Sequence, residues 1–218
     1  MRVAALYDVH GNLPALEAVL KEVPSDAVIV VGGDVAAGPF PQETVDRLRA
    51  LGERVKWIRG NADRELTQQG RGLAPPEVIE WVRSRLTLNT LEWLGRLSPT
   101  LVWERVLYCH ATPRNDEDIF TERTPEERIA SLFADVEQDV VVCGHTHMQF
   151  DRIVAGKRVV NAGSVGMSYD EPHGAYWTLD LEPRHSPYKL ETGDYPFAWP
   201  SLPRDEAVAF FETLAVGP

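Results

Sequence analysis

Asp8 and His10 are the first residues in the chain whose types and spacing could do chemistry. They follow the apolar run from Val3 to Tyr7, which is typical of a buried β-strand. Because alternate residues of an extended strand point to the same side, the Asp8 carboxylate and the His10 imidazole can converge on one point. Such a pair suits a divalent metal ion, although a polar turn after a strand would give the same three-residue pattern.

Further potential metal ligands follow four later apolar runs. They are Asp34 after residues 27–31, Asn61 after 55–58, His110 after 105–109, and His145 with His147 after 139–143. Four of the six histidines therefore stand at predicted strand ends. Open α/β sheets place their active sites at the carboxyl ends of strands, so this distribution indicates one shared site rather than scattered structural histidines.

The elements that must position these residues alternate in the first part of the chain. Strand-like runs lie at residues 3–7, 27–31 and 55–58, with helical patterns at 13–23 and 43–51 between them. This alternation predicts right-handed parallel βαβ units. Residues 64–98 change to helical periodicity. They are predicted to form an insertion, either a cap that shapes substrate access or a layer that only packs against the sheet.

The second part of the chain favours antiparallel pairing. The pattern predicts a hairpin at 101–109, a helix at 124–134 with Thr124 as its N-cap, and strands at 149–154, 157–161, 175–181 and 186–191. Residues 193–218 are predicted to form an aromatic-rich strap and a helix that pack onto the core or contact a second copy. We predict a single domain over residues 1–218, of mixed α/β (α+β) class. Its expected architecture is a four-layer αββα sandwich of two mixed β-sheets flanked by helices.

The composition bounds the function. A formal net charge of −11 argues against binding to extended nucleic acid, which depends on lysine and arginine to neutralise phosphates. No apolar run approaches the roughly 20 residues that span a bilayer. Met1 and Arg2 lead directly into the first strand without a secretory pattern, so we expect a cytoplasmic protein with no membrane partner. Cys109 and Cys143 are expected to be reduced, buried thiols, with a disulfide as the alternative.

Taken in order, these motifs resemble those of the calcineurin-like metallophosphoesterases. The family pattern appears as Asp8-Val-His10, Gly33-Asp34, Gly60-Asn61-Ala62-Asp63, His110 and Gly144-His145-Thr146-His147. The segment Asn161-Ala-Gly-Ser164-Val-Gly is similar to one in the small bacterial phosphodiesterase branch of that family. The resemblance extends from residue 3 to about residue 166.

The resemblance implies a centre with two divalent metal ions. One ion would be held by Asp8, His10 and His147, the other by Asn61, His110 and His145, with Asp34 bridging them. The mixed nitrogen and oxygen ligands favour Mn²⁺, with Zn²⁺, iron or Ni²⁺ as alternatives. The implied reaction is hydrolysis of phosphodiesters, activated phosphoesters or nucleotides by in-line attack of a hydroxide that bridges the ions.

Other residues have less certain roles in this scheme. Asn12 and Arg114 are candidate phosphate contacts, although Asn12 could equally cap a helix and Arg114 could form a surface ion pair. The family's histidine after Gly-Asn, which assists the leaving group, is Ala62 here. Because general-acid help contributes about 10² to 10⁴ in rate, its loss predicts a preference for good leaving groups unless Asp63 or a neighbouring arginine substitutes.

Several alternatives of other kinds stay open. The same fold could serve as a phosphomonoesterase or a dinucleoside-polyphosphate hydrolase. It could also be a non-catalytic metal-binding scaffold, although every ligand position is filled here. A nuclease is disfavoured by the acidic balance. The partner expected from the sequence is a small phosphoester or nucleotide substrate, with a homo-oligomer as a further possibility.

Overall fold

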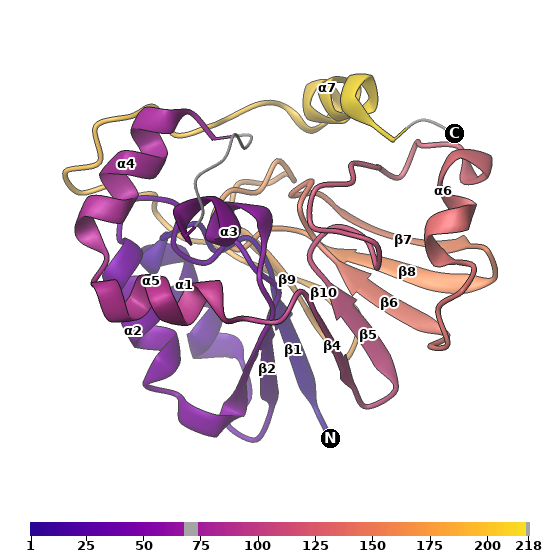
Figure 1. Ribbon diagram of the computed structural model, residues 1–218, viewed down its shortest axis with the longest axis horizontal. Helices are drawn as coiled ribbons and strands as arrows, with labels where there is room; N and C mark the ends of the chain where they lie inside the picture. The colour runs from indigo at the N-terminus through magenta and orange to yellow at the C-terminus, as the bar shows by residue number, and fades with distance from the viewer. Residues whose placement is uncertain (68–73, 217–218) are drawn as a thin grey trace.

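The computed structural model describes residues 1–67 and 74–216 of the chain. Within these residues, two mixed five-stranded β-sheets pack face to face, and helices cover both outer faces (Figure 1). The order of layers is helix, sheet, sheet, helix, which confirms the predicted αββα fold class. Among the described residues, no helix is long and apolar enough to cross a membrane.

The first sheet carries the βαβ units. Its strands β1 (Val3–Leu6), β2 (Val28–Val31) and β3 (Val55–Trp57) run parallel, and β9 (Ala175–Leu179) and β10 (Glu182–Ser186) extend it antiparallel beyond β1. The prediction of a strand at 186–191 is wrong. Asp180 and Leu181 adopt positive φ angles of 54° and 68° and close a two-residue hairpin turn, so the strand starts four residues earlier.

The second sheet combines parallel and antiparallel pairs. Its order is β4 (Thr100–Trp103), β5 (Val106–Cys109), β6 (Val140–Cys143), β8 (Lys157–Ala162) and β7 (Gln149–Val154). The central strands β5, β6 and β8 are parallel, while β4 and β7 are antiparallel edge strands. The carboxyl ends of β5 and β6 thus meet at one edge, where His110 and His145 follow them.

Alternating side chains of β1 divide between two cores. Ala5 and Tyr7 face the other sheet and pack in the cluster that contains Tyr108 and Val142. The Tyr7 hydroxyl donates a hydrogen bond of 3.0 Å to the Val142 carbonyl oxygen across this layer. Leu6 points the opposite way, into the core beneath the outer helices. The two-residue period of the strand therefore builds both interfaces from one segment.

The outer helices are α1 (Leu13–Glu22) and α2 (Pro41–Arg49) on the first sheet and α6 (Glu126–Phe133) on the second (Figure 1). A short 3₁₀ helix, η1 (Gly52–Arg54), follows α2. The predicted Thr124 N-cap of α6 is wrong. Pro125 occupies that position, and the Thr124 hydroxyl donates instead to the Glu212 carboxylate.

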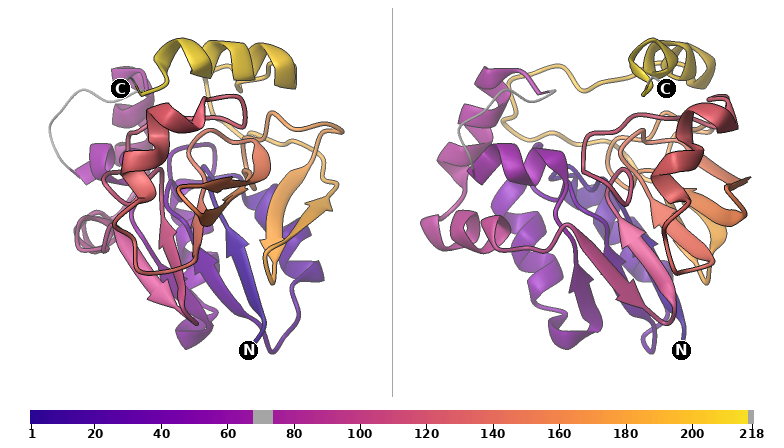
Figure 2. Two further views of the ribbon diagram at one scale, coloured as in Figure 1. Left: turned by 90° about the vertical axis from the view of Figure 1, so that its right-hand side faces the viewer. Right: turned by 45° about the vertical axis from the view of Figure 1, so that its right-hand side comes forward.

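The segment that connects β3 of the first sheet to β4 of the second is helical, with α3 (Asn61–Thr67), α4 (Pro76–Arg85) and α5 (Leu88–Gly95). Val82 of α4 and Leu94 of α5 are fully buried in the core of the first sheet, so this segment packs against that sheet. Pro75, Glu77 and Val78 of the same segment also line the cavity described below, as a cap that shapes substrate access would. In Figure 1, α4 lies near the top of the molecule, beside the chain that follows residue 186. This chain forms a strap that runs to α7 (Arg204–Leu214), above the second sheet (Figures 1 and 2).

Candidate metal centre

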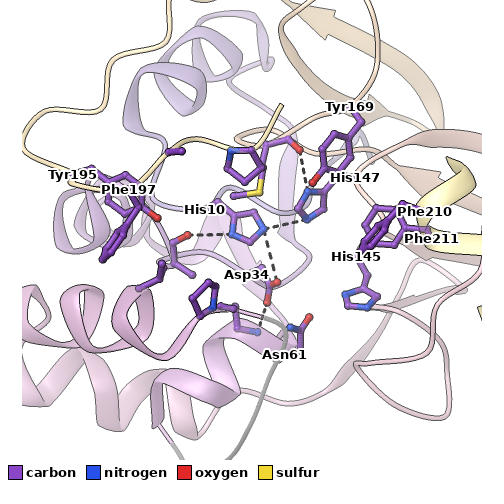
Figure 3. A pocket seen from close by; sticks show the side chains of 18 of the residues that line it. His10, Asp34, Asn61, His145, His147, Tyr169, Tyr195, Phe197, Phe210 and Phe211 are labelled. Atoms are coloured by element: carbon purple, nitrogen blue, oxygen red, sulfur yellow. Dashed lines mark hydrogen bonds and ion pairs between the residues drawn. The ribbon is translucent and has the colours of Figure 1, made fainter. Parts of the chain in front are cut away.

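All seven predicted ligands come together in one buried group. Each lies at or just beyond the carboxyl end of a strand, and none is more than 7% exposed. Figure 3 shows His10, Asp34, Asn61, His145 and His147 directed toward a common space. The complete set is Asp8, His10, Asp34, Asn61, His110, His145 and His147.

Two compact sets of ligand atoms lie within this group. The atoms of Asp8, His10 and His147 lie within 4.8 Å of one another, and so do those of Asp8, Asp34 and His110. Asp8 therefore belongs to both sets. Asp34 Oδ2 lies 3.8 Å from His10 Nε2 and 3.5 Å from His110 Nε2. Both carboxylates are positioned to serve two neighbouring cations.

The rings of His10 and His147 are oriented for a cation rather than for each other. Each Nδ1 lies within hydrogen-bond distance of a carbonyl oxygen, 3.2 Å from Ala37 O and 2.9 Å from Met167 O respectively. A carbonyl oxygen only accepts, so each Nδ1 carries a proton, and in the neutral form of each ring Nε2 presents a lone pair. These two Nε2 atoms are only 3.1 Å apart. Two facing lone pairs at that distance repel, whereas a metal ion between them would bind both.

His110 shows the same arrangement. Its Nδ1 lies 2.8 Å from the Gly32 carbonyl oxygen, which leaves Nε2 facing the Asn61 Oδ1 acceptor at 3.0 Å. The Asn61 amide nitrogen is turned away and donates to Glu65 at 3.3 Å, which directs its oxygen to the centre. With no metal ion bound, a proton on His110 Nε2 faces the Asn61 amide oxygen and the Asp34 carboxylate, and a metal ion that binds Nε2 would displace this proton.

Two buried polar atoms at the centre have no hydrogen-bond partner among the described residues. They are Asp8 Oδ1 and His145 Nε2. A buried polar atom without a partner costs about 1–3 kcal/mol, so its persistence calls for a ligand. His145 lies outside both compact sets but lines the same cavity as His10 and His147. The donor set and these orphaned atoms fit two divalent metal ions.

The electrostatics of the centre point the same way. Burial alone would lower the pKa of His110, but the Asp34 and Asp8 carboxylates outweigh it and raise that pKa to about 10. Burial and the neighbouring His110 lower the pKa of His145 to about 4. Burial would raise the pKa of Asp34, yet His110 and His10 hold it well below its ordinary value. The carboxylates thus attract positive charge to the centre, which is a proton on His110 when no metal ion is bound.

The backbone at the centre adopts an uncommon conformation. Five ligands have φ angles in the left-handed region: Asp8 at 53°, His10 at 49°, Asp34 at 53°, His145 at 70° and His147 at 61°. This region costs most side chains roughly 1–2 kcal/mol per residue. Close approach adds a second constraint, because a Cβ atom on Gly60 would overlap Asp34 Oδ1. Tight turns at the strand ends therefore turn the ligands inward.

Buried polar residues behind the ligands hold these turns. The Asp63 carboxylate accepts hydrogen bonds from the backbone N–H groups of Asp34, Val35 and Gly60, at 2.9, 3.0 and 3.1 Å. Burial and the nearby Asp34 raise the pKa of Asp63 to about 7.

The segment resembling that of the phosphodiesterase branch supports the other side of the centre. Asn161 Nδ2 donates to the Gly144 carbonyl at 2.8 Å, and the Ser164 hydroxyl donates to the Asp8 carbonyl at 2.8 Å. These bonds fix the turns that carry His145 and Asp8. A supporting role therefore accounts for the sequence pattern in this segment.

Comparison with known proteins agrees with this geometry. The model of the calcineurin-like phosphoesterase superfamily domain matches residues 1–184. The chain belongs to this superfamily. A metallophosphoesterase from Sphaerobacter thermophilus has the same fold, with a TM-score of 0.73 at 24% identity over 87% of this chain and 90% of that one.

Two curated proteins are also similar to this calcineurin-like phosphoesterase. An uncharacterized protein of Methanocaldococcus jannaschii is 23% identical over 185 residues, which cover 78% of this chain and 72% of that protein. A symmetrical bis(5'-nucleosyl)-tetraphosphatase of Janthinobacterium sp. (strain Marseille) is 27% identical over 119 residues, covering 51% of this chain and 43% of that protein.

Three residues predicted to contact substrate lie elsewhere. Asn12 is fully buried, caps α1 through Ala15 N at 3.1 Å, and donates to the Gly166 carbonyl at 2.8 Å. Arg114 pairs with Asp118 at 2.7 Å and does not line the cavity among its described residues. The geometry gives Asp63, like Asn12, a positioning task, which differs from the expectation of direct catalysis.

The position of the family's leaving-group histidine does face the site of this phosphoesterase. Ala62 lines the cavity next to Asn61, and its backbone N–H donates to Asp34 Oδ1 at 2.8 Å. The sequence did not identify the aromatic residues that line the rest of the cavity, Tyr169, Phe210 and Phe211. Tyr195 and Phe197 were noted only as part of an aromatic tail. The signal for Tyr195, Phe197, Phe210 and Phe211 is the high aromatic content of residues 193–218, and Tyr169 carries no such signal.

Proposed function

We propose that this chain hydrolyses phosphodiesters, or other phosphoesters with good leaving groups, by means of two divalent metal ions. One observation carries the proposal: His10 Nε2 and His147 Nε2 face each other at 3.1 Å beside two buried carboxylates, an arrangement that a metal ion between the rings would satisfy. Membership of the calcineurin-like phosphoesterase superfamily supports the class of reaction.

The proposed tasks follow from the orientation of each side chain. Asp8, His10 and His147 would hold one ion, Asn61, His110 and His145 the other, and Asp34 would contact both. Ions bound there would activate water and neutralise phosphoryl oxygens. The backbone carbonyl oxygens behind the histidine rings fix their tautomers and keep each Nε2 directed inward. Mn²⁺ is our first choice, with Zn²⁺, iron and Ni²⁺ next, because the ligands mix nitrogen and oxygen.

The substrate preference rests on Ala62. A methyl group at this position cannot donate a proton to a departing oxygen, although it lines the cavity. Asp63 accepts three backbone hydrogen bonds, which keeps its carboxylate away from that task. Aryl esters and anhydrides leave without such help, so we propose them over alkyl monoesters.

A second candidate is hydrolysis of dinucleoside polyphosphates. The similarity to the Janthinobacterium tetraphosphatase favours it. The cavity argues against it, since no lysine or arginine lines it among the described residues and a polyphosphate chain carries several negative charges. A direct comparison of the two substrates on one enzyme preparation separates the candidates.

The test combines metal analysis with an activity screen. We expect the chelated protein to be inactive toward bis(p-nitrophenyl) phosphate and to regain turnover when Mn²⁺ is added. Asp34→Asn should lose turnover, while Asp26→Asn makes the same chemical change at an exposed site and should keep it. Metal binding without turnover of any phosphoester would favour the scaffold alternative. Absence of metal binding would overturn the proposal.

A further inference from the structure

A cavity of about 500 Å³ lies directly above the candidate metal centre. His10, Asp34, Asn61 and the two C-terminal histidines of the ligand set form its floor. Its walls are largely apolar, and Figure 3 shows aromatic rings on two sides of the ligands. We name these the strap wall, formed by Tyr195 and Phe197, and the helix wall, formed by Tyr169, Phe210 and Phe211.

Most of this aromatic lining comes from outside the part of the chain that the superfamily model matches. That match ends at residue 184, whereas four of the five wall residues lie between 195 and 211. The strap and α7 cross the top of the molecule above the strand ends (Figure 1).

Contacts with α4 hold the strap wall in place. Arg85 forms an ion pair of 2.8 Å with Asp194, directly before the wall. The Trp81 ring meets the Tyr195 ring edge to face, with centroids 5.0 Å apart, and Tyr195 meets Phe197 at 5.3 Å. These contacts leave the wall anchored while its Tyr195 and Phe197 side chains still line the cavity.

The helix wall is anchored by polar contacts at both ends of α7. Arg204 pairs with Asp170 and with Glu122, the latter at 2.6 Å. Near the other end, Glu212 accepts a hydrogen bond of 2.6 Å from the Thr121 hydroxyl. Phe210 nevertheless keeps 53% of its surface exposed. An anchored helix with an exposed aromatic ring beside an active site offers apolar surface to a ligand.

The charge of the cavity limits what can enter. Among the described residues, no lysine or arginine lines it, and Glu77 is the only charged side chain outside the metal-ligand set. Metal ions bound at the centre would neutralise one phosphate, but a second phosphate or a carboxylate would meet no lysine or arginine among the described lining residues. The volume lies within the range of about 300–1,000 Å³ that is typical for small-molecule sites.

We propose that this cavity selects phosphodiesters whose ester groups are uncharged aromatic rings, one ring against each wall and the phosphate over the metal centre. The inference rests on the proposed phosphodiesterase function and names its substrate class. Ring packing on either wall would exclude water from the phosphate and hold it over the ligands.

The experiment compares two substrates that release the same p-nitrophenolate. One is phenyl p-nitrophenyl phosphate and the other is methyl p-nitrophenyl phosphate, so they differ only in the retained group. Burying a ring of this size predicts a ratio of kcat/KM of roughly tenfold to a hundredfold in favour of the phenyl ester. Diphenyl phosphate should also bind more tightly than dimethyl phosphate in calorimetry of the Mn²⁺-loaded protein, which tests the walls without turnover.

Two wall variants then locate the ring. We expect one of Phe197→Ala and Phe210→Ala to bring the phenyl-to-methyl ratio close to one. The other should lower kcat/KM for both esters, because it removes the surface that holds the common p-nitrophenyl group. Leu202→Ala is the control, since Leu202 lies on the same segment, is 41% exposed and does not line the cavity.

The outcomes separate this inference from the proposed function. Equal kcat/KM for phenyl and methyl esters in the unmodified protein, with metal-dependent turnover of both, overturns the aromatic selection alone. An unchanged ratio in both wall variants does the same. No metal-dependent turnover of either ester overturns the proposed function itself.

Discussion

Replacing Gly60 with alanine tests whether backbone spacing, beyond the set of ligands, builds the metal centre. A Cβ atom at Gly60 would lie 2.5 Å from the Asp34 backbone nitrogen and still closer to Asp34 Oδ1, whereas ordinary contact begins at 3.4 Å. The Asp34 backbone nitrogen must therefore move by about 0.9 Å, and its carboxylate must move further. A displacement of about 1 Å at a reacting centre costs on the order of 10²-fold in rate, and overpacking typically costs about 1–3 kcal/mol.

The assay measures three quantities on the Gly60→Ala protein. We expect kcat/KM for bis(p-nitrophenyl) phosphate to fall about a hundredfold and metal content to fall with it. The thermal midpoint should drop by roughly 2–12 °C, since 1 kcal/mol corresponds to about 2–4 °C in a chain of this size. Gly95→Ala is the matched control, because its Cβ would lie 3.6 Å from Thr67 in ordinary contact. That variant should be unchanged or up to about 1 kcal/mol more stable. Full metal content and full activity in Gly60→Ala would refute the reasoning.

Three further changes test other parts of the site. Ala62→His should introduce a proton donor and raise kcat/KM by about 10² to 10⁴ for esters with poor leaving groups, with little change for p-nitrophenyl esters. A series of esters whose leaving groups differ in pKa measures this effect. An unchanged slope of log kcat/KM against leaving-group pKa contradicts it. Asp63→Ala leaves three buried backbone N–H groups without their acceptor and should cost at least about 2 kcal/mol in urea unfolding, so a loss below about 0.5 kcal/mol counts against the positioning role. Cys109 and Cys143 are free and buried, and burial raises the pKa of both thiols. Neither should react with a thiol reagent at pH 8 until the protein is denatured, which absorbance of the released chromophore reports.

The sequence could predict the ligand set because each ligand follows an apolar strand. Asp8 and Asp34 follow strands of the first sheet, and His110 and His145 follow strands of the second. Parallel strands bring such ends to one edge of each sheet, which local periodicity and a general rule of sheet topology predict. The packing of the two sheets against each other then brings the two pairs together, and local periodicity does not encode that step.

The predictions were wrong where contacts between distant residues, or an unusual backbone conformation, determine the local structure. The β9–β10 turn places Leu181 at a positive φ, a conformation that leucine rarely adopts, so no turn residue marks this position in the sequence. Thr124 follows a capping pattern, yet Glu212 lies 88 residues away in sequence and takes its hydroxyl. The helix wall likewise depends on where α7 lies, which its own sequence does not encode. Asn12 carried both a helix-cap and a substrate signal, and only the buried contacts of its amide distinguish them.

The left-handed backbone at five ligands has a consequence for protein engineering. A designer who copied only the ligand identities onto another pair of sheets would place histidines on ordinary strands, and their rings would not turn toward a common point. The transferable unit is the strand end together with its turn and the buried acceptors behind it, such as Asp63. Among single replacements at Asp8, Asp34 or the histidines, asparagine tolerates this backbone best. It is therefore the replacement of choice for disabling the chemistry while leaving the scaffold intact.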